Sequence, residues 1–158
     1  MTNSIAEIEA SGCIFVIGSN TTACHPLIAR RIFRAKERGA KLIVADPRNI
    51  QLSRFADVAV NHRLGSDVAL LNGMMHVIIK NGWQAEDYIA QRTEDYEALE
   101  KIVNAYTPDK VREITGVDCQ HLERMAELYA THPPACCTPW ATRCVTKIRK
   151  KYSTRWHP

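Results

Sequence analysis

The stretch Cys13–Pro26, CIFVIGSNTTACHP, decides the fold of this 158-residue chain. Its first five residues form a short apolar run that ends at a Gly-Ser-Asn turn, a pattern typical of a buried strand in a parallel sheet. Pro26 is suited to begin a helix, because the first N–H of a helix has no partner within it. The stretch therefore predicts a strand, a tight loop and a helix. In that arrangement backbone N–H groups and the positive end of a helix bind nucleotide phosphates.

Further elements follow in an alternating order. Apolar runs predict strands over 41–45 and 57–60, and one turn of helix is predicted over 51–55. Helices are predicted over 4–10, 26–38 and about 67–81, and then over 86–91, 96–105, 108–114 and 118–129. This order predicts an α/β, Rossmann-like domain with a mainly parallel sheet and flanking helices, followed by a helical segment.

Composition excludes several classes of protein. No apolar run reaches the roughly 20 residues that span a bilayer, and the N-terminus lacks the pattern of a signal peptide. We therefore expect no membrane insertion and a cytoplasmic location, while export of a longer parent to the periplasm stays open. The six cysteines show neither C-x-x-C nor a His at zinc-ligand spacing, so we expect no metal site and no disulfide framework.

Net charge is unevenly distributed along the chain. The formal net charge is +4, but residues 133–158 contain six Lys or Arg and no acid, so residues 1–132 carry −2. A nucleic-acid-binding surface would thus depend on residues 133–158 alone, and we expect no nucleic-acid partner.

Three loops follow the three predicted strands, and right-handed crossovers bring such loops to one edge of the sheet. Their candidate binding residues are Gly18, Ser19, Asn20, Asp46, Arg48, Gly65 and Asp67. Gly18 permits close approach of a phosphate, Asp46 can accept from ribose hydroxyls, and Asp67 can accept from the amine and ring N–H of guanine. Taken singly, the three loops also fit a common turn, a strand-ending turn and a helix cap.

An NAD site fits this pattern less well. G-x-G-x-x-G is absent, and the next glycine after Gly18 is Gly39. A free-standing module that binds a guanine nucleotide or NAD, without redox activity, remains the alternative interpretation. A nucleic-acid-binding protein that uses its basic tail is a third.

Several motifs occur in a fixed order: VIGSN, HP at the start of a helix, AKLIVADPR, and a Gly-Ser-Asp loop followed by VALLNGMMHVII. In this order they resemble the molybdopterin-guanine-dinucleotide oxidoreductases, most of all the large subunit of molybdenum- or tungsten-dependent formate dehydrogenase. The resemblance covers roughly residues 1–131. It implies a truncated chain in which residues 1–132 form part of the domain that binds molybdopterin guanine dinucleotide (MGD).

The resemblance also implies roles for the loops, which would wrap one arm of a bis-MGD cofactor. Residues 18–20 would contact phosphate and ribose, Asp46 and Arg48 would hold ribose and phosphates, and Gly65 and Asp67 would frame the guanine. The family commonly has Pro where this chain has Leu64.

Other parts of the family pattern are missing. The N-terminal Cys motif for an iron–sulfur cluster and the Cys or selenocysteine metal ligand are absent from this sequence. We therefore assign no catalytic residue and no metal ligand, and His62, His76 and His121 are interpreted as surface or core residues. The intact enzyme would oxidise formate to carbon dioxide, whereas this chain alone would be inactive. The expected partners are the cofactor, the remainder of the large subunit and electron-transfer subunits, and uncovered apolar faces predict self-association.

Residues 133–158 form an atypical basic tail without periodicity, predicted to be disordered. A frame change inside the Ala135 codon permits Val-Leu-Tyr-Ala-Met-Gly-Tyr-Ala-Val and, further on, Pro-Glu-Glu-Val-Leu-Asn-Ala-Val-Ala. These segments would be an apolar strand and the start of a helix, similar to the family's next segment. The hypothesis is that the tail is frame-shifted; the alternative is a genuine basic tail that binds acidic surfaces.

Overall fold

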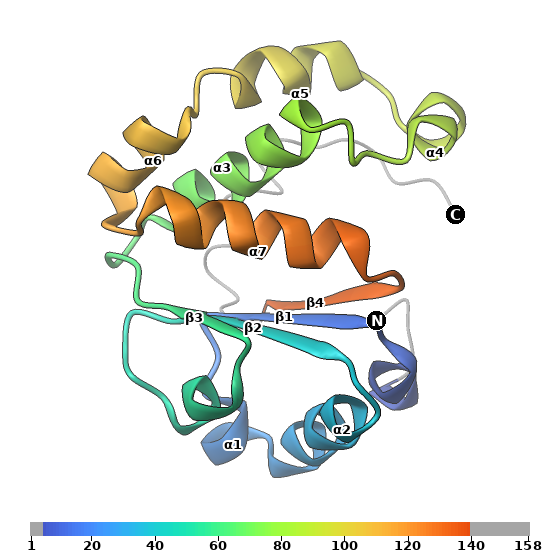
Figure 1. Ribbon diagram of the computed structural model, residues 1–158, viewed down its shortest axis with the longest axis vertical. Coiled ribbons are helices and arrows are strands. Elements are labelled where there is room, and N and C mark those ends of the chain that lie inside the picture. The colour runs from blue at the N-terminus through green and yellow to red at the C-terminus, as the bar shows by residue number, and fades with distance from the viewer. Residues whose placement is uncertain (1–4, 140–158) are drawn as a thin grey trace.

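A four-stranded parallel sheet forms the centre of the computed structural model, which describes residues 5–139 (Figure 1). Its strands are β1 (Cys13–Ile17), β2 (Lys41–Ala45), β3 (Val58–Val60) and β4 (Ala135–Pro139). They lie in the order β3-β2-β1-β4, and every neighbouring pair is parallel. The predicted parallel α/β fold is therefore confirmed.

Helices cover both faces of the sheet, so the domain has three layers (Figure 1). One face carries η1 (Ile5–Ala10), α1 (Thr21–Cys24), α2 (Pro26–Glu37) and η2 (Gln51–Phe55). The other carries α3 (Asp67–Lys80), α6 (Pro108–Thr115) and α7 (Cys119–Thr131), with α4 (Glu86–Arg92) and α5 (Tyr96–Val103) farther from the sheet. This is the helical segment expected after the sheet.

Strand β1 is buried along its whole length, as its continuous apolar run predicts. Cys13, Phe15 and Ile17 pack in the core that includes α3, α6 and α7, whereas Ile14 and Val16 pack in the core that includes α2. The alternation follows from the period of two residues in a strand. One strand thereby joins two hydrophobic cores and determines where the loop after Ile17 emerges.

Two short elements differ from the prediction. Residues 5–10 form a 3₁₀ helix, and a single turn of helix, α1, occupies the segment predicted as loop between residues 20 and 26. In α1 the N–H groups of Ala23 and Cys24 donate to the carbonyl of Asn20. Four residues are too few to show a helical period, so the sequence pattern does not reveal this turn.

Strand β4 is the third difference, because no ordered structure was expected after residue 132. It pairs with β1 along its whole length, with Ala135 opposite Cys13 at one end and Pro139 opposite Ile17 at the other. Just before the strands, Gly12 N–H donates to the carbonyl of Pro134 at 2.9 Å. The edge of β1 that faces away from β2 offers backbone N–H and C=O groups that need partners. A neighbouring segment can pair with these groups whatever side chains it carries. Residues 140–158, the rest of the predicted tail, lie outside the described residues.

Candidate functional site

The loops after β1, β2 and β3 meet at the carboxyl edge of the sheet. Gly18 N–H donates to the carbonyl of Ala45 at 2.9 Å, and Asp46 N–H donates to the carbonyl of Val60 at 3.2 Å. The loops after β1 and β2 are thus each tied by a backbone hydrogen bond to the end of the following strand. The structure brings all seven predicted site residues to this one edge, where ligands of open α/β sheets bind.

The loop after β1 turns through Gly18, whose φ of 59° lies in the left-handed region that favours glycine. Ser19 is buried, and Asn20 precedes α1 with its Oδ1 accepting from Thr22 Oγ1 at 3.0 Å. The Thr21 hydroxyl is buried and has no partner among the residues described. A buried hydroxyl without a partner is costly in a folded protein, and it suits a loop whose polar contacts a ligand completes.

Asp46 and Arg48 form one unit in the loop after β2. Asp46 Oδ1 accepts from Arg48 N–H at 2.9 Å and from Arg48 Nε at 3.1 Å. The Asp46 side chain is 1% exposed, whereas that of Arg48 is 67% exposed. The hydrogen bond with Asp46, and then its charge, raises the pKa of Arg48 above its ordinary value. The buried carboxylate therefore anchors a permanent cation that faces solvent at the sheet edge.

The loop after β3 turns through Gly65, whose φ is 79°. Ser66 precedes α3, and its hydroxyl donates to the carbonyl of Arg63 at 2.6 Å without capping the helix. Arg63 Nη1 in turn donates to the carbonyl of Glu113 at 2.6 Å, which ties this loop to α6. These contacts hold Asp67 at the first position of α3.

His62 and Asn61 lie at the candidate site, and sequence reasoning missed both. His62 is buried, which agrees with its interpretation as a core residue, but its Nε2 also lies 3.0 Å from Asp67 Oδ1, a pairing that the sequence did not predict. Asn61 Nδ2 donates to the carbonyls of Asp46 and Arg48 at 2.8 and 3.0 Å. One signal was available for His62: the buried positions Val58 and Val60 continue with period two to residue 62.

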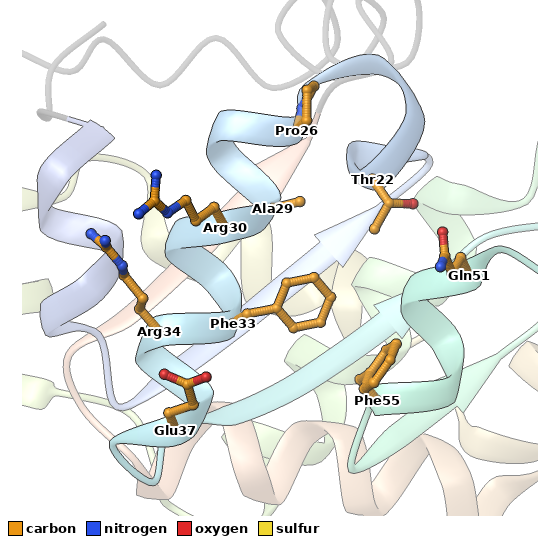
Figure 2. A pocket seen from close by; sticks show the side chains of 9 residues that line it. All are labelled: Thr22, Pro26, Ala29, Arg30, Phe33, Arg34, Glu37, Gln51 and Phe55. Atoms are coloured by element: carbon orange, nitrogen blue, oxygen red, sulfur yellow. The ribbon is translucent and has the colours of Figure 1, made fainter.

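A groove of about 560 Å³ lies beside this edge, between α2 and η2. Figure 2 shows Phe33 and Phe55 facing each other across it, and their ring centroids lie 5.0 Å apart in an edge-to-face contact. Thr22 and Gln51 line the same groove. None of the seven predicted site residues lines this groove, so it lies beside the candidate site and is not part of it.

Within residues 5–139, no three His, Cys, Asp or Glu side chains gather as potential metal ligands. No helix there is long and apolar enough to cross a membrane.

The family model for molybdopterin oxidoreductases matches residues 1–141. The chain belongs to this family. The resemblance inferred from the motifs is thereby confirmed, and family membership implies a molybdopterin cofactor. The chain is 46% identical over 129 residues to the F420-dependent formate dehydrogenase subunit alpha of Methanocaldococcus jannaschii, covering 82% of this chain and 19% of the relative.

Two further comparisons support the assignment to this family. The chain is 43% identical over 130 residues to formate dehydrogenase H of Escherichia coli, covering 82% of this chain and 18% of the relative. Acetylene hydratase from Pelobacter acetylenicus shares the fold with a TM-score of 0.78 and 32% identity, over 87% of this chain and 20% of that structure. This molybdopterin oxidoreductase chain thus spans about a fifth of the length of the relatives that it matches.

Proposed function

We propose that this chain is a piece of a formate-dehydrogenase-type large subunit that binds one guanine dinucleotide arm of a bis-MGD cofactor. The observation that carries the proposal is the joining of three polar loops at one sheet edge by backbone hydrogen bonds. The relatives named formate dehydrogenase support the choice of substrate.

The groups at this edge fit a nucleotide. The exposed Arg48 guanidinium, oriented by buried Asp46, would pair with phosphate oxygens. Gly18 would lie against the phosphate and ribose, together with Ser19, Asn20 and the Thr21 hydroxyl, which has no partner within residues 5–139. Gly65 and Asp67 would frame the guanine, whose ring N–H and amine match the two oxygens of a carboxylate.

When bound, the molybdenum or tungsten centre would supply the oxidation of formate to carbon dioxide. The described residues would bind and orient one arm of the cofactor and contribute no reacting group. Other polypeptides would supply the iron–sulfur clusters, the remainder of the large subunit and the electron-transfer subunits. The assembled enzyme would lie in the cytoplasm. The 158-residue chain alone would not turn over formate, and exposed apolar residues such as Leu64 and Leu27 favour its self-association.

Binding of guanosine diphosphate to the 158-residue chain tests the site. An NMR titration should shift resonances of the three loops, and Asp67→Ala should weaken binding roughly 10-fold, the effect of losing about 1.4 kcal/mol. Asp87→Ala is the matched control, because Asp87 also occupies the first turn of a helix but lies in α4. Equal loss in both variants, or shifts confined to other surfaces, would refute the site.

We also propose that the reading frame changes near Ala135. Supporting this, β4 pairs with a completely buried strand, yet its own Ala135 and Cys137 are exposed. Sequencing the encoding DNA in all three frames is the direct test. A continuous downstream frame that encodes an apolar strand and a helix is the expected result, and its absence would refute the frame change.

A further inference from the structure

We propose that His62 is a positioning residue that holds the Asp67 carboxylate in the orientation that distinguishes guanine from purines without the exocyclic amine. This inference rests on the proposed nucleotide site. It adds a residue that lies outside the motifs on which the resemblance rests.

The geometry of the pair is specific. The His62 side chain is completely buried at 0% exposure, and its Nε2 lies 3.0 Å from Oδ1 of Asp67, which is 17% exposed. An ionised carboxylate only accepts hydrogen bonds, so Nε2 is the donor. The bond joins the end of the β3 loop to the first residue of α3 and restricts rotation of the carboxyl group.

His62 has no second polar partner in the described part of the chain. Its Nδ1 is buried and makes no hydrogen bond with residues 5–139. Position 62 continues the buried face of β3 after Val58 and Val60, where an apolar side chain would cost less. The polar function of His62 is therefore directed at Asp67.

The chemistry of guanine explains why orientation matters. Its ring N–H and amine are two parallel donors, and a carboxylate must present both oxygens in their plane to accept both. Two carboxylate oxygens offer about four acceptor sites, so the bond from His62 leaves capacity for these donors. Without His62, binding guanine would have to immobilise the Asp67 side chain. That cost would lower the preference for guanine over a purine without the amine by roughly 3- to 10-fold.

The test compares guanosine diphosphate with inosine diphosphate, which lacks only the amine. NMR titrations of the 158-residue chain should show a preference for guanosine diphosphate, reduced roughly 3- to 10-fold in His62→Leu. His62→Gln places an amide donor near the position of Nε2 and should restore the preference. His62→Asn places it near Nδ1 and should not, which provides a polar variant if the leucine variant does not fold.

Two controls separate selectivity from folding. His76→Leu makes the same replacement inside α3, fourteen residues after His62, and should leave the preference unchanged. In the Asp67→Ala background the preference should be absent, and His62→Leu should have no further effect on it.

The outcomes distinguish the inference from the function on which it rests. Equal weakening of both nucleotides by His62→Leu and His62→Asn, with the preference intact, would show a purely structural His62 and overturn the inference alone. If the unsubstituted chain binds neither nucleotide, or both equally, the guanine site fails and the inference fails with it.

Discussion

Helix α3 approaches α6 and α7 closely because residue 73 has no side chain. A methyl group on Gly73 would lie 2.7 Å from Cγ2 and 3.0 Å from Cγ1 of Val111, and 3.2 Å from Cδ2 of Leu122. Valine in a helix is largely confined to one rotamer, and both of its methyl groups are near, so rotation does not clear the space. We therefore predict that Gly73→Ala destabilises the fold.

The magnitude follows from two opposing effects. Alanine is favoured over glycine inside a helix by about 0.8–1.0 kcal/mol. Inserting a carbon into a packed core costs about 1–3 kcal/mol. The net effect is a loss of about 1 kcal/mol in the free energy of unfolding, which would lower the Tm of a chain of this size by about 2–4 °C.

Urea denaturation followed by far-UV circular dichroism, at one dilute protein concentration, measures this difference. Val111→Ala is the matched background, because it removes the two nearest obstructing methyl groups and leaves only Cδ2 of Leu122, the end of a flexible side chain. In that background Gly73→Ala should become stabilising by about 1 kcal/mol, the helix-propensity gain alone. If Gly73→Ala stabilises the parent chain by that amount, α3 and α6 do not pack as closely as described and the reasoning is refuted.

Two further predictions concern pH. Burial opposes ionisation of Asp57, but hydrogen bonds from Lys36 Nζ and Leu42 N–H, each 2.8 Å long, outweigh it and lower its pKa. This stabilisation is present above the ordinary pKa of 3.8 and is lost as the pH falls through the pKa of the folded state. In urea titrations, Asp57→Asn should lower the free energy of unfolding by about 1 kcal/mol at pH 7 and by less at pH 3. An equal cost at both pH values would contradict the assignment. Burial, followed by the charge of Asp57, raises the pKa of Cys13 from 9.0 to about 11, so the protonated thiol favours folding below pH 9 and that contribution disappears as the pH rises to about 11. Cys13→Ala should flatten this alkaline decline, measured by the same denaturation at pH 8 and pH 11, and an unchanged decline would assign it to other groups.

The fold was largely predictable because its signals are local. The continuous apolar runs of β1 and β2 and the glycine turns after them indicate a parallel sheet without any tertiary information. Helices α2 and α3 were equally evident from their period and their ends. Helix α1 is too short to show a period. Strand β4 has no apolar pattern of its own, and its strand conformation comes from pairing with β1, so the sequence did not predict it.

The candidate site was predictable at the level of loops. Strand order and right-handed crossovers require the loops after parallel strands to meet at one edge, and the backbone bond from Gly18 to Ala45 agrees with this. Which side chains pair within that edge was not predictable. His62 and Asp67 are five residues apart, and the turn at Gly65 brings them together.

By itself, the sequence determined the parallel α/β architecture, the family motifs and the seven residues that gather at the carboxyl edge. Only the tertiary structure decided that Asp46 anchors Arg48, that His62 holds Asp67, and that Gly73 lets α3 approach Val111. The physical reason is that periodicity reports which face of its own element a residue occupies. Hydrogen bonds and close contacts depend on distances of a few ångströms, which are set by the paths of loops and the packing of separate elements.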